Sequence, residues 1–236
     1  LRVGRPGDGA PAPCGECQQR HEHRRPQQRW IEPCRRWQPD DRHRGKDAEA
    51  DRLTEEVLEA SSTAGIPLLI ETHRATMTQD IWRTLRLVER FPEIRFNVDF
   101  SHWYTGHDMP VSDMTAKIEQ LAPVMERVRY MHGRIGTGGC VQINVGAGDD
   151  DVAPVSHFRA MWTKAFGGFI VNAANDRQPV LDLQIGFAPE LLPADIGYAR
   201  KFPTPNGDLE EESDRWEQAF VLTRIASECF AEALNN

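Results

Sequence analysis

Four side chains that can bind metal ions each follow a short apolar segment of this chain. In chain order, they belong to Glu71, Asp99, His132 and Glu190. Apolar segments rich in β-branched residues predict buried strands of a parallel sheet, and such strands present chemistry at their carboxyl ends. Carboxylates and an imidazole gathered there can converge on one metal ion or on one substrate hydroxyl. Repetition of the pattern at four strands favours a site over a coincidence.

The segment 94–103 shows the pattern most clearly. Asp99 ends its predicted strand and His102 lies three residues later in the following turn, so an acid and an imidazole can meet at one ligand. A structural interpretation is also open, in which Asp99 caps the next helix and His102 packs against Trp103. The recurrence at the other three strands favours the site.

Predicted strands alternate with predicted helices from residue 47 onward. The strands cover 67–74, 94–99, 128–134 and 180–190, and the helices cover 47–64, 78–91, 113–127, 155–173 and 214–234. The intervals from Glu71 to Asp99 and from Asp99 to His132 are 28 and 33 residues. They are close to the roughly 31 residues per unit of an eight-fold β/α barrel of about 250 residues. We expect the glycine-rich stretch 136–149, which lengthens the next interval, to form a lid over the site.

Composition limits the classes of partner. The 236 residues carry a net charge of −8 and are 39% hydrophobic, with a mean hydropathy of −0.56. Residues 1–45 hold ten arginines against six acidic residues, so the remainder carries −12. An acidic surface repels phosphate backbones, and we expect no nucleic-acid partner. With no membrane-length apolar run, no signal-peptide core, and isolated cysteines at 140 and 229, we expect a cytoplasmic protein without membrane contact or disulfides.

Residues 1–46 differ in character from the rest. They are rich in arginine and proline and show no helix or strand periodicity. Cys14 and Cys17, followed by His21, His23 and Cys34, have the outward form of a zinc knuckle, but a second ligand pair at a defined spacing is missing. A disordered basic tail is a second interpretation. A third, which we favour, is a non-native stretch that arose from a frameshift in a GC-rich gene.

The four strand-end residues and the spacing of the units resemble the xylose-isomerase-like TIM barrels of sugar phosphate isomerases and epimerases. The resemblance covers about residues 47–236 and implies an α/β barrel of which the last four βα units are present. It implies that one divalent cation, Mn, Co, Mg or Zn, is bound by Glu71, Asp99, His132 and Glu190. It also implies substrate contacts from His102 and Arg134. His73 joins them as a substrate contact because period-two alternation turns it to the same side as Glu71.

The activity implied by the resemblance is proton transfer next to a carbonyl of a sugar or a related hydroxy-carbonyl compound, through an enediolate. A divalent cation that chelates the carbonyl and hydroxyl oxygens would acidify the carbon proton. Glu71 and Glu190 are the carboxylates available to exchange that proton, and they are the predicted catalytic pair. The expected partner is therefore a small molecule, and a homo-oligomer is left open.

The chain departs from the family pattern in two ways. Four strands before Glu71 would need roughly 120 residues, so we expect an incomplete barrel. The stretch 133–136 lacks a further acid found in many members, which leaves the sugar open. A rival interpretation is a metal-dependent phosphodiesterase related to endonuclease four, but that class needs more histidines for three zinc ions. An inactive barrel fragment is the non-enzymatic alternative.

Overall fold

The computed structural model describes residues 41–111, 113–149, 153–172 and 184–236. Within them, four strands form a parallel sheet in the order β1-β2-β3-β4. The strands are β1 (Ile70–Glu71), β2 (Phe96–Val98), β3 (Val128–His132) and β4 (Gly186–Ala188). The predicted α/β class with a parallel sheet is thereby confirmed at the level of these strands.

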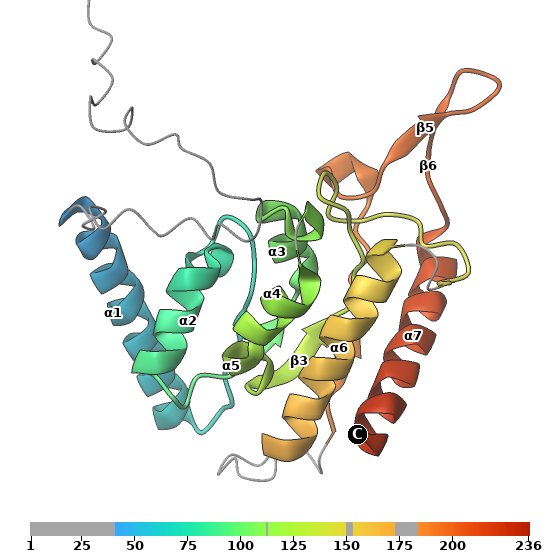
Figure 1. The fold of residues 1–236 in the computed structure, drawn as a ribbon. Helices are drawn as coiled ribbons and strands as arrows, with labels where there is room; N and C mark the ends of the chain where they lie inside the picture. Colours follow the sequence, from blue (N-terminus) through green and yellow to red (C-terminus); the bar gives the residue numbers. More distant parts are fainter. Residues whose placement is uncertain (1–40, 112, 150–152, 173–183) are drawn as a thin grey trace, which may run out of the picture. The chain divides into compact units, whose positions relative to one another are not determined.

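Helices connect the strands, and further helices begin and end the described chain (Figure 1). The elements are α1 (Asp41–Ala64), η1 (Met77–Gln79), α2 (Ile81–Arg90), α3 (Phe100–Gly106), η2 (Met109–Val111), α4 (Met114–Gln120), α5 (Ala122–Met125), α6 (Ala153–Asn172), η5 (Ala194–Ile196) and α7 (Arg215–Asn235). Figure 1 shows α1 beside α2 and α6 beside α7, with α5 between α2 and α6. This succession of strands and helices is the βα repeat that the sequence predicts.

Side-chain carboxylates fix where several helices begin. Asp80 caps α2 by accepting a hydrogen bond from the backbone N–H of Arg83, and Asp214 caps α7 in the same way from Trp216 and Glu217. Such caps satisfy backbone donors that have no partner within the helix. Helix α7 therefore starts where the sequence predicts it.

The core lies around the central strands. Phe96 and Val98 of β2 are fully buried, as are Val128 and Met131 of β3. Helix α6 covers the neighbouring strands with aromatic residues, and the ring of Trp162 meets that of Phe187 on β4 edge to face, with 5.3 Å between the ring centroids. The apolar side chains of β2 and β3 therefore lie at the centre of the hydrophobic core.

Two glycines allow the strands near the site to pack closely. A Cβ atom added to Gly133 would lie 1.8 Å from the ring of Phe187, and one added to Gly186 would lie 2.2 Å from the ring of Tyr130. Neither space could hold an alanine without movement of an aromatic ring. The two glycines thus let β3 and β4 lie against each other's aromatic side chains.

Several elements differ from the prediction. The strands are shorter, and the helix predicted over 113–127 is divided into α4 and α5 at Leu121, just before Pro123, whose ring does not fit a helix interior. An antiparallel hairpin of β5 (Lys201–Pro203) and β6 (Leu209–Glu211) was not predicted. It turns at Thr204–Gly207, where Gly207 has a φ of 88°.

Parts of the prediction lie beyond what the structure describes. Residues 1–40 lie outside the described residues, so the proposed non-native segment stays a prediction. Residues 173–183, which include the start of the last predicted strand, lie outside them as well. Helix α1 begins at Asp41 rather than at the predicted residue 47. No helix among the described residues is both long enough and apolar enough to cross a membrane.

Candidate metal centre

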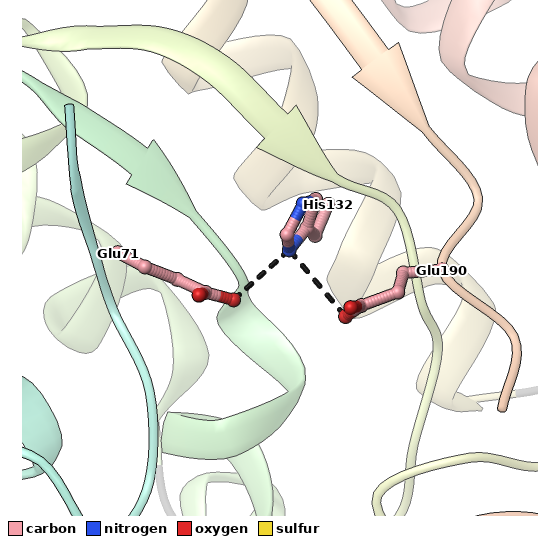
Figure 2. A group of neighbouring side chains, drawn as sticks. All are labelled: Glu71, His132 and Glu190. Atoms are coloured by element: carbon pink, nitrogen blue, oxygen red, sulfur yellow. Dashed lines mark hydrogen bonds and ion pairs between the residues drawn. The ribbon is translucent and has the colours of Figure 1, made fainter. Parts of the chain in front are cut away.

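Three of the four predicted ligands meet at one edge of the sheet (Figure 2). Glu71 ends β1, His132 ends β3, and Glu190 follows β4 by two residues. One potential ligand atom from each lies within 4.8 Å of the others. His132 Nδ1 is 2.9 Å from Glu71 Oε1 and 3.4 Å from Glu190 Oε2. The carboxyl ends of parallel strands therefore bring these side chains together, as the sequence predicts.

The chemistry of this group fits a divalent cation. Two carboxylates and one imidazole are donors that Mn, Co, Mg and Zn accept, and three protein ligands leave positions open for water or substrate. The side chains of Glu71 and Glu190 are 35% and 33% exposed, whereas that of His132 is 19% exposed. The ligand atoms are thus sheltered by the sheet and still reachable from solvent.

Asp99 takes a different position from the one expected of a fourth ligand. It is the N-cap of α3, where its Oδ1 accepts hydrogen bonds from the backbone N–H of Ser101 at 2.8 Å and from the Ser101 hydroxyl at 2.6 Å. Its Oδ2 is paired with Arg134, and both side chains are fully buried. The capping interpretation of Asp99 is therefore observed. Asp99 does not belong to the group formed by Glu71, His132 and Glu190, and Arg134 holds its other oxygen. A metal-binding role for Asp99 therefore stays a prediction.

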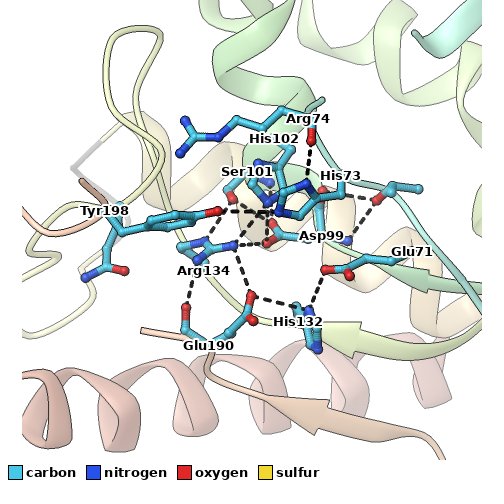
Figure 3. Close-up of polar contacts among 12 residues, drawn as sticks. Glu71, His73, Arg74, Asp99, Ser101, His102, His132, Arg134, Glu190 and Tyr198 are labelled. Atoms are coloured by element: carbon cyan, nitrogen blue, oxygen red, sulfur yellow. Dashed lines mark hydrogen bonds and ion pairs between the residues drawn. The ribbon is translucent and has the colours of Figure 1, made fainter. Parts of the chain in front are cut away.

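Arg134 joins Asp99 to the metal-ligand group (Figure 3). Its Nη2 contacts Asp99 Oδ2 and also lies 3.1 Å from Glu190 Oε2, while its Nη1 donates to the Glu190 carbonyl at 3.0 Å. Its Nε donates to the hydroxyl of Ser101. A buried guanidinium is stable only when it is paired in this way. The predicted substrate contact is thus directed mainly at protein groups.

The two predicted substrate histidines lie side by side next to Arg134. The rings of His73 and His102 have centroids 3.9 Å apart, and Tyr198 OH lies 3.4 Å from His73 Nε2. Burial lowers the pKa of His102 to about 4, so the ring is neutral at neutral pH. His102 Nε2 then accepts from Arg134 Nη2 at 3.3 Å, and its Nδ1 has no hydrogen-bond partner among the described residues. These rings offer polar atoms beside the triad.

The glycine-rich loop 136–149 is tied to the segment that carries Glu190. The side-chain amide of Gln142 accepts from the backbone N–H of Leu192 at 2.9 Å and donates to its carbonyl at 3.0 Å. The backbone N–H of Val145 donates to the side chain of Gln218 on α7 at 2.8 Å. The loop predicted as a lid therefore fixes the chain two residues beyond Glu190, and lid movement stays a prediction.

Some residues of the site were not predicted from the sequence. Tyr198 lies over the guanidinium of Arg134, with its ring centroid 4.7 Å from Cζ, and Arg74 lies 4.8 Å from the same ring. Asn97, on β2, contacts His132. Asn97 lies two residues before Asp99 and so alternates onto the same face of the strand, a signal that could have indicated it. No comparable periodicity marks Tyr198.

Comparison of the chain with protein-family models, with curated proteins and with solved structures gave no match.

Proposed function

We propose that this chain is a divalent-metal-dependent isomerase or epimerase of the xylose-isomerase-like barrel type, acting on a sugar, a sugar phosphate or a related hydroxy-carbonyl compound. The observation that carries the proposal is the convergence of Glu71, His132 and Glu190 within 4.8 Å at the carboxyl edge of a parallel sheet. Ligands of open α/β sheets bind at this edge. The resemblance in the sequence supplies the reaction class.

The charges of the site support a divalent cation. Glu71, Glu190 and Asp99 bring three carboxylates, and Arg134 is the guanidinium that pairs with two of them. The formal charges then leave an excess of two negative charges beside the largely buried imidazole of His132. Such an excess is costly in a partly buried site unless a cation balances it. A divalent cation held by Glu71, His132 and Glu190 would balance these charges. Asp99 stays the proposed fourth ligand, a role that requires Arg134 to release Asp99 Oδ2.

The bound cation would polarise the carbonyl oxygen and the adjacent hydroxyl oxygen of the substrate. This would acidify the proton on the carbon that bears the hydroxyl group. Glu71 ends β1 and Glu190 follows β4, and one carboxylate oxygen of each lies within 3.4 Å of His132 Nδ1. We propose that they exchange the carbon proton, one removing it and the other returning it, through an enediolate. Both glutamate side chains are about one third exposed, which leaves them accessible to a substrate.

The neighbouring polar side chains would bind the substrate's oxygens. His73, His102 and Arg134 are the proposed contacts, with His102 neutral because of its burial. A neutral imidazole can donate a hydrogen bond from Nδ1, the atom of His102 that lacks a partner among the described residues. Because this Nδ1 atom is buried, a substrate oxygen would accept from it only after the side chains around His102 move.

The rival phosphodiesterase of the endonuclease-four type is less well supported. That class requires ligands for three zinc ions, and one three-residue group of potential ligands is found in the described part of the chain. The acidic balance of residues 46–236 also disfavours a DNA substrate.

The test is proton exchange in heavy water. Candidate ketoses, aldoses and keto acids are incubated with the protein and Mn²⁺, and deuterium at substrate carbons is followed by NMR. We expect incorporation by the wild type and at least a 100-fold slower rate in Glu190→Gln, because removal of an acid/base group costs about 10²–10⁴-fold. Glu119→Gln, an exposed position on α4, is the control and should retain the rate. Cleavage of an abasic-site oligonucleotide with no exchange in any sugar would instead support the phosphodiesterase.

A further inference from the structure

Arg74 differs from most other arginines of the described chain because its guanidinium has no acidic partner there. Most of the described arginines pair with a carboxylate, as Arg83 does with Asp47 and Arg134 does with Asp99. The partly buried guanidinium of Arg74 forms neither an ion pair nor a hydrogen bond with the described residues. A positive charge that is partly shielded from water and lacks an acceptor favours the binding of an anion.

The ring of Tyr198 determines where this guanidinium lies. Cζ of Arg74 lies over the ring at 4.8 Å from its centroid, and Cζ of Arg134 lies 4.7 Å from the same centroid. In Figure 3, the ring of Tyr198 lies between the two arginine side chains. The N–H donors of a guanidinium lie in its own plane, so contact with an aromatic ring leaves them directed at other groups. Arg134 donates to protein oxygens, whereas the donors of Arg74 are available to a ligand.

The turn that carries Arg74 begins at the metal-ligand group. Arg74 lies three residues after Glu71, the ligand that ends β1. Glu71, His73 and Thr76 line one open pocket, so this turn forms part of its wall. The hydroxyl of Tyr198 lies 3.4 Å from His73 Nε2. A ligand bound at the metal centre would therefore have Arg74 and Tyr198 as its neighbours.

Side chains of the turn itself hold its backbone in place. Ala75 has a φ of 61°, a conformation that is uncommon for a residue other than glycine. Its backbone N–H donates to the side chain of Gln79 at 2.6 Å, and the hydroxyl of Thr76 donates to the carbonyl of His73 at 2.7 Å. These bonds fix the backbone from which the side chain of Arg74 extends, which lowers the entropy cost of binding a ligand.

We propose that Arg74 binds the phosphate group of a phosphorylated sugar whose carbonyl and hydroxyl oxygens bind at the metal centre. A phosphate monoester carries a charge of about −1.5 to −2 at pH 7 and has three acceptor oxygens. These oxygens match the planar N–H donors of a guanidinium, and the hydroxyl of Tyr198 is a further donor beside them. The inference rests on the proposed function and narrows its substrates to phosphate esters.

The test compares two unreactive ligands that differ only in the phosphate. Ribitol 5-phosphate and ribitol lack a carbonyl group, and the affinity of the full chain for each is measured by calorimetry with Mn²⁺ present. We expect the wild type to prefer ribitol 5-phosphate, and Arg74→Gln to bind it about 10–100-fold more weakly, the range for hydrogen bonds to charged groups. Arg74→Lys keeps the charge without the planar donors and should bind with intermediate affinity. Arg52→Gln, which removes the same charge from the exposed face of α1, is the control and should bind as the wild type does.

Inorganic phosphate, titrated in the presence of a chelator, separates Arg74 from the metal centre. We expect the wild type to bind it and Arg74→Gln to bind it at least 10-fold more weakly, while melting curves establish that each variant folds. Equal affinity of the wild type for ribitol 5-phosphate and ribitol, or unchanged affinity for ribitol 5-phosphate in Arg74→Gln, would overturn the role of Arg74. Ribonate bound as tightly as ribitol 5-phosphate would overturn the choice of phosphate over carboxylate. Failure of the wild type to bind Mn²⁺ would instead contradict the proposed metal site itself.

Discussion

His132 and Arg134, two residues apart, share the acidic side chains of the site between them. His132 Nδ1 faces Glu71 and Glu190, whereas Arg134 Nη2 faces Asp99 and Glu190. Glu190 Oε2 therefore contacts both, and the proposed cation, bound through this oxygen, would compete with Arg134 for it. Glu190 is for this reason the residue through which the metal-ligand group and the buried ion pair influence each other.

His102 provides a pH-dependent contribution to stability. Burial lowers its pKa from 6.5 to about 4. Between pH 6.5 and about pH 4, His102 binds a proton in the unfolded chain but not in the folded chain. The free energy of unfolding therefore falls as the pH drops through this window. The loss at the acidic end is on the order of 3 kcal/mol. Urea unfolding of the wild type from about pH 7 to pH 4.5 measures it.

Replacement of the imidazole isolates this contribution. His102→Gln cannot take up a proton, so the slope of stability against pH between 4 and 6.5 should become shallower than in the wild type. His107→Gln, at an exposed position, should keep the slope of the wild type. An equal slope in His102→Gln and the wild type would show that His102 does not cause it.

At the residue scale, the potential metal ligands could be predicted from the sequence, although they come from different strands, because each one follows an apolar segment. Glu71, His132 and Glu190 followed from that rule. The pairing of Asp99 with Arg134 could not be predicted, because nothing in the sequence marks a buried ion pair. Their contact depends on how the start of α3 lies beside the residues that follow β3. The contact from Tyr198 depends in the same way on tertiary structure.

Among the elements, α6 contains two neighbouring glycines with opposite surroundings. A Cβ atom on Gly168 would lie 2.7 Å from the carbonyl oxygen of Met125 and 2.9 Å from Cα of Glu126, whereas one on Gly167 would meet nothing within 4 Å. Gly168 therefore lets α6 approach the backbone at the end of α5. Gly167 has no such reason to be a glycine in the packing of the described residues.

This difference predicts opposite effects of the same substitution. Gly167→Ala should stabilise the protein by about 0.5–1 kcal/mol, because alanine favours the helix interior over glycine. Gly168→Ala should destabilise it by about 1–3 kcal/mol, because the added methyl meets rigid backbone. Denaturant unfolding of the two variants beside the wild type measures both, and changes of the same sign would contradict the assigned packing.

Element types were easier to predict than element limits. Helix α7 was predicted nearly to its ends because Asp214 caps an amphipathic segment. The division of α4 from α5 follows from Pro123, a signal present in the sequence but outweighed by the helical periodicity around it. The β5–β6 hairpin packs few apolar residues, so alternation gave no clear pattern, although Asn206-Gly207 is a turn signal.

At the scale of the molecule, the parallel sheet explains why residues up to 119 positions apart can act together. Short strands in the order β1-β2-β3-β4 place Glu71, His132 and Glu190 at one edge. The spacing of the βα units predicted this arrangement without any contact information. The sequence could not predict the orientation of each side chain at that edge, since it depends on the register between strands and on ion pairs such as that of Arg134.

The proposed metal binding would link the site to the stability of the whole molecule. A cation that binds the folded chain alone raises the free energy of unfolding, by about 2.7 kcal/mol at a free concentration one hundred times Kd. The most direct test of the metal centre is therefore a titration with Mn²⁺ by calorimetry, compared among the wild type, Glu71→Gln and Glu190→Gln, with Glu119→Gln as the control at an exposed position.

The metal centre predicts one Mn²⁺ ion per chain in the wild type and in Glu119→Gln. In Glu71→Gln and Glu190→Gln we expect the affinity to fall at least 100-fold, about 2.8 kcal/mol, because each variant loses a charged ligand. Asp99→Ala should abolish binding as well if Asp99 is the fourth ligand. Stoichiometry and affinity that stay unchanged in both glutamine variants would contradict the assignment of Glu71, His132 and Glu190 as a metal site.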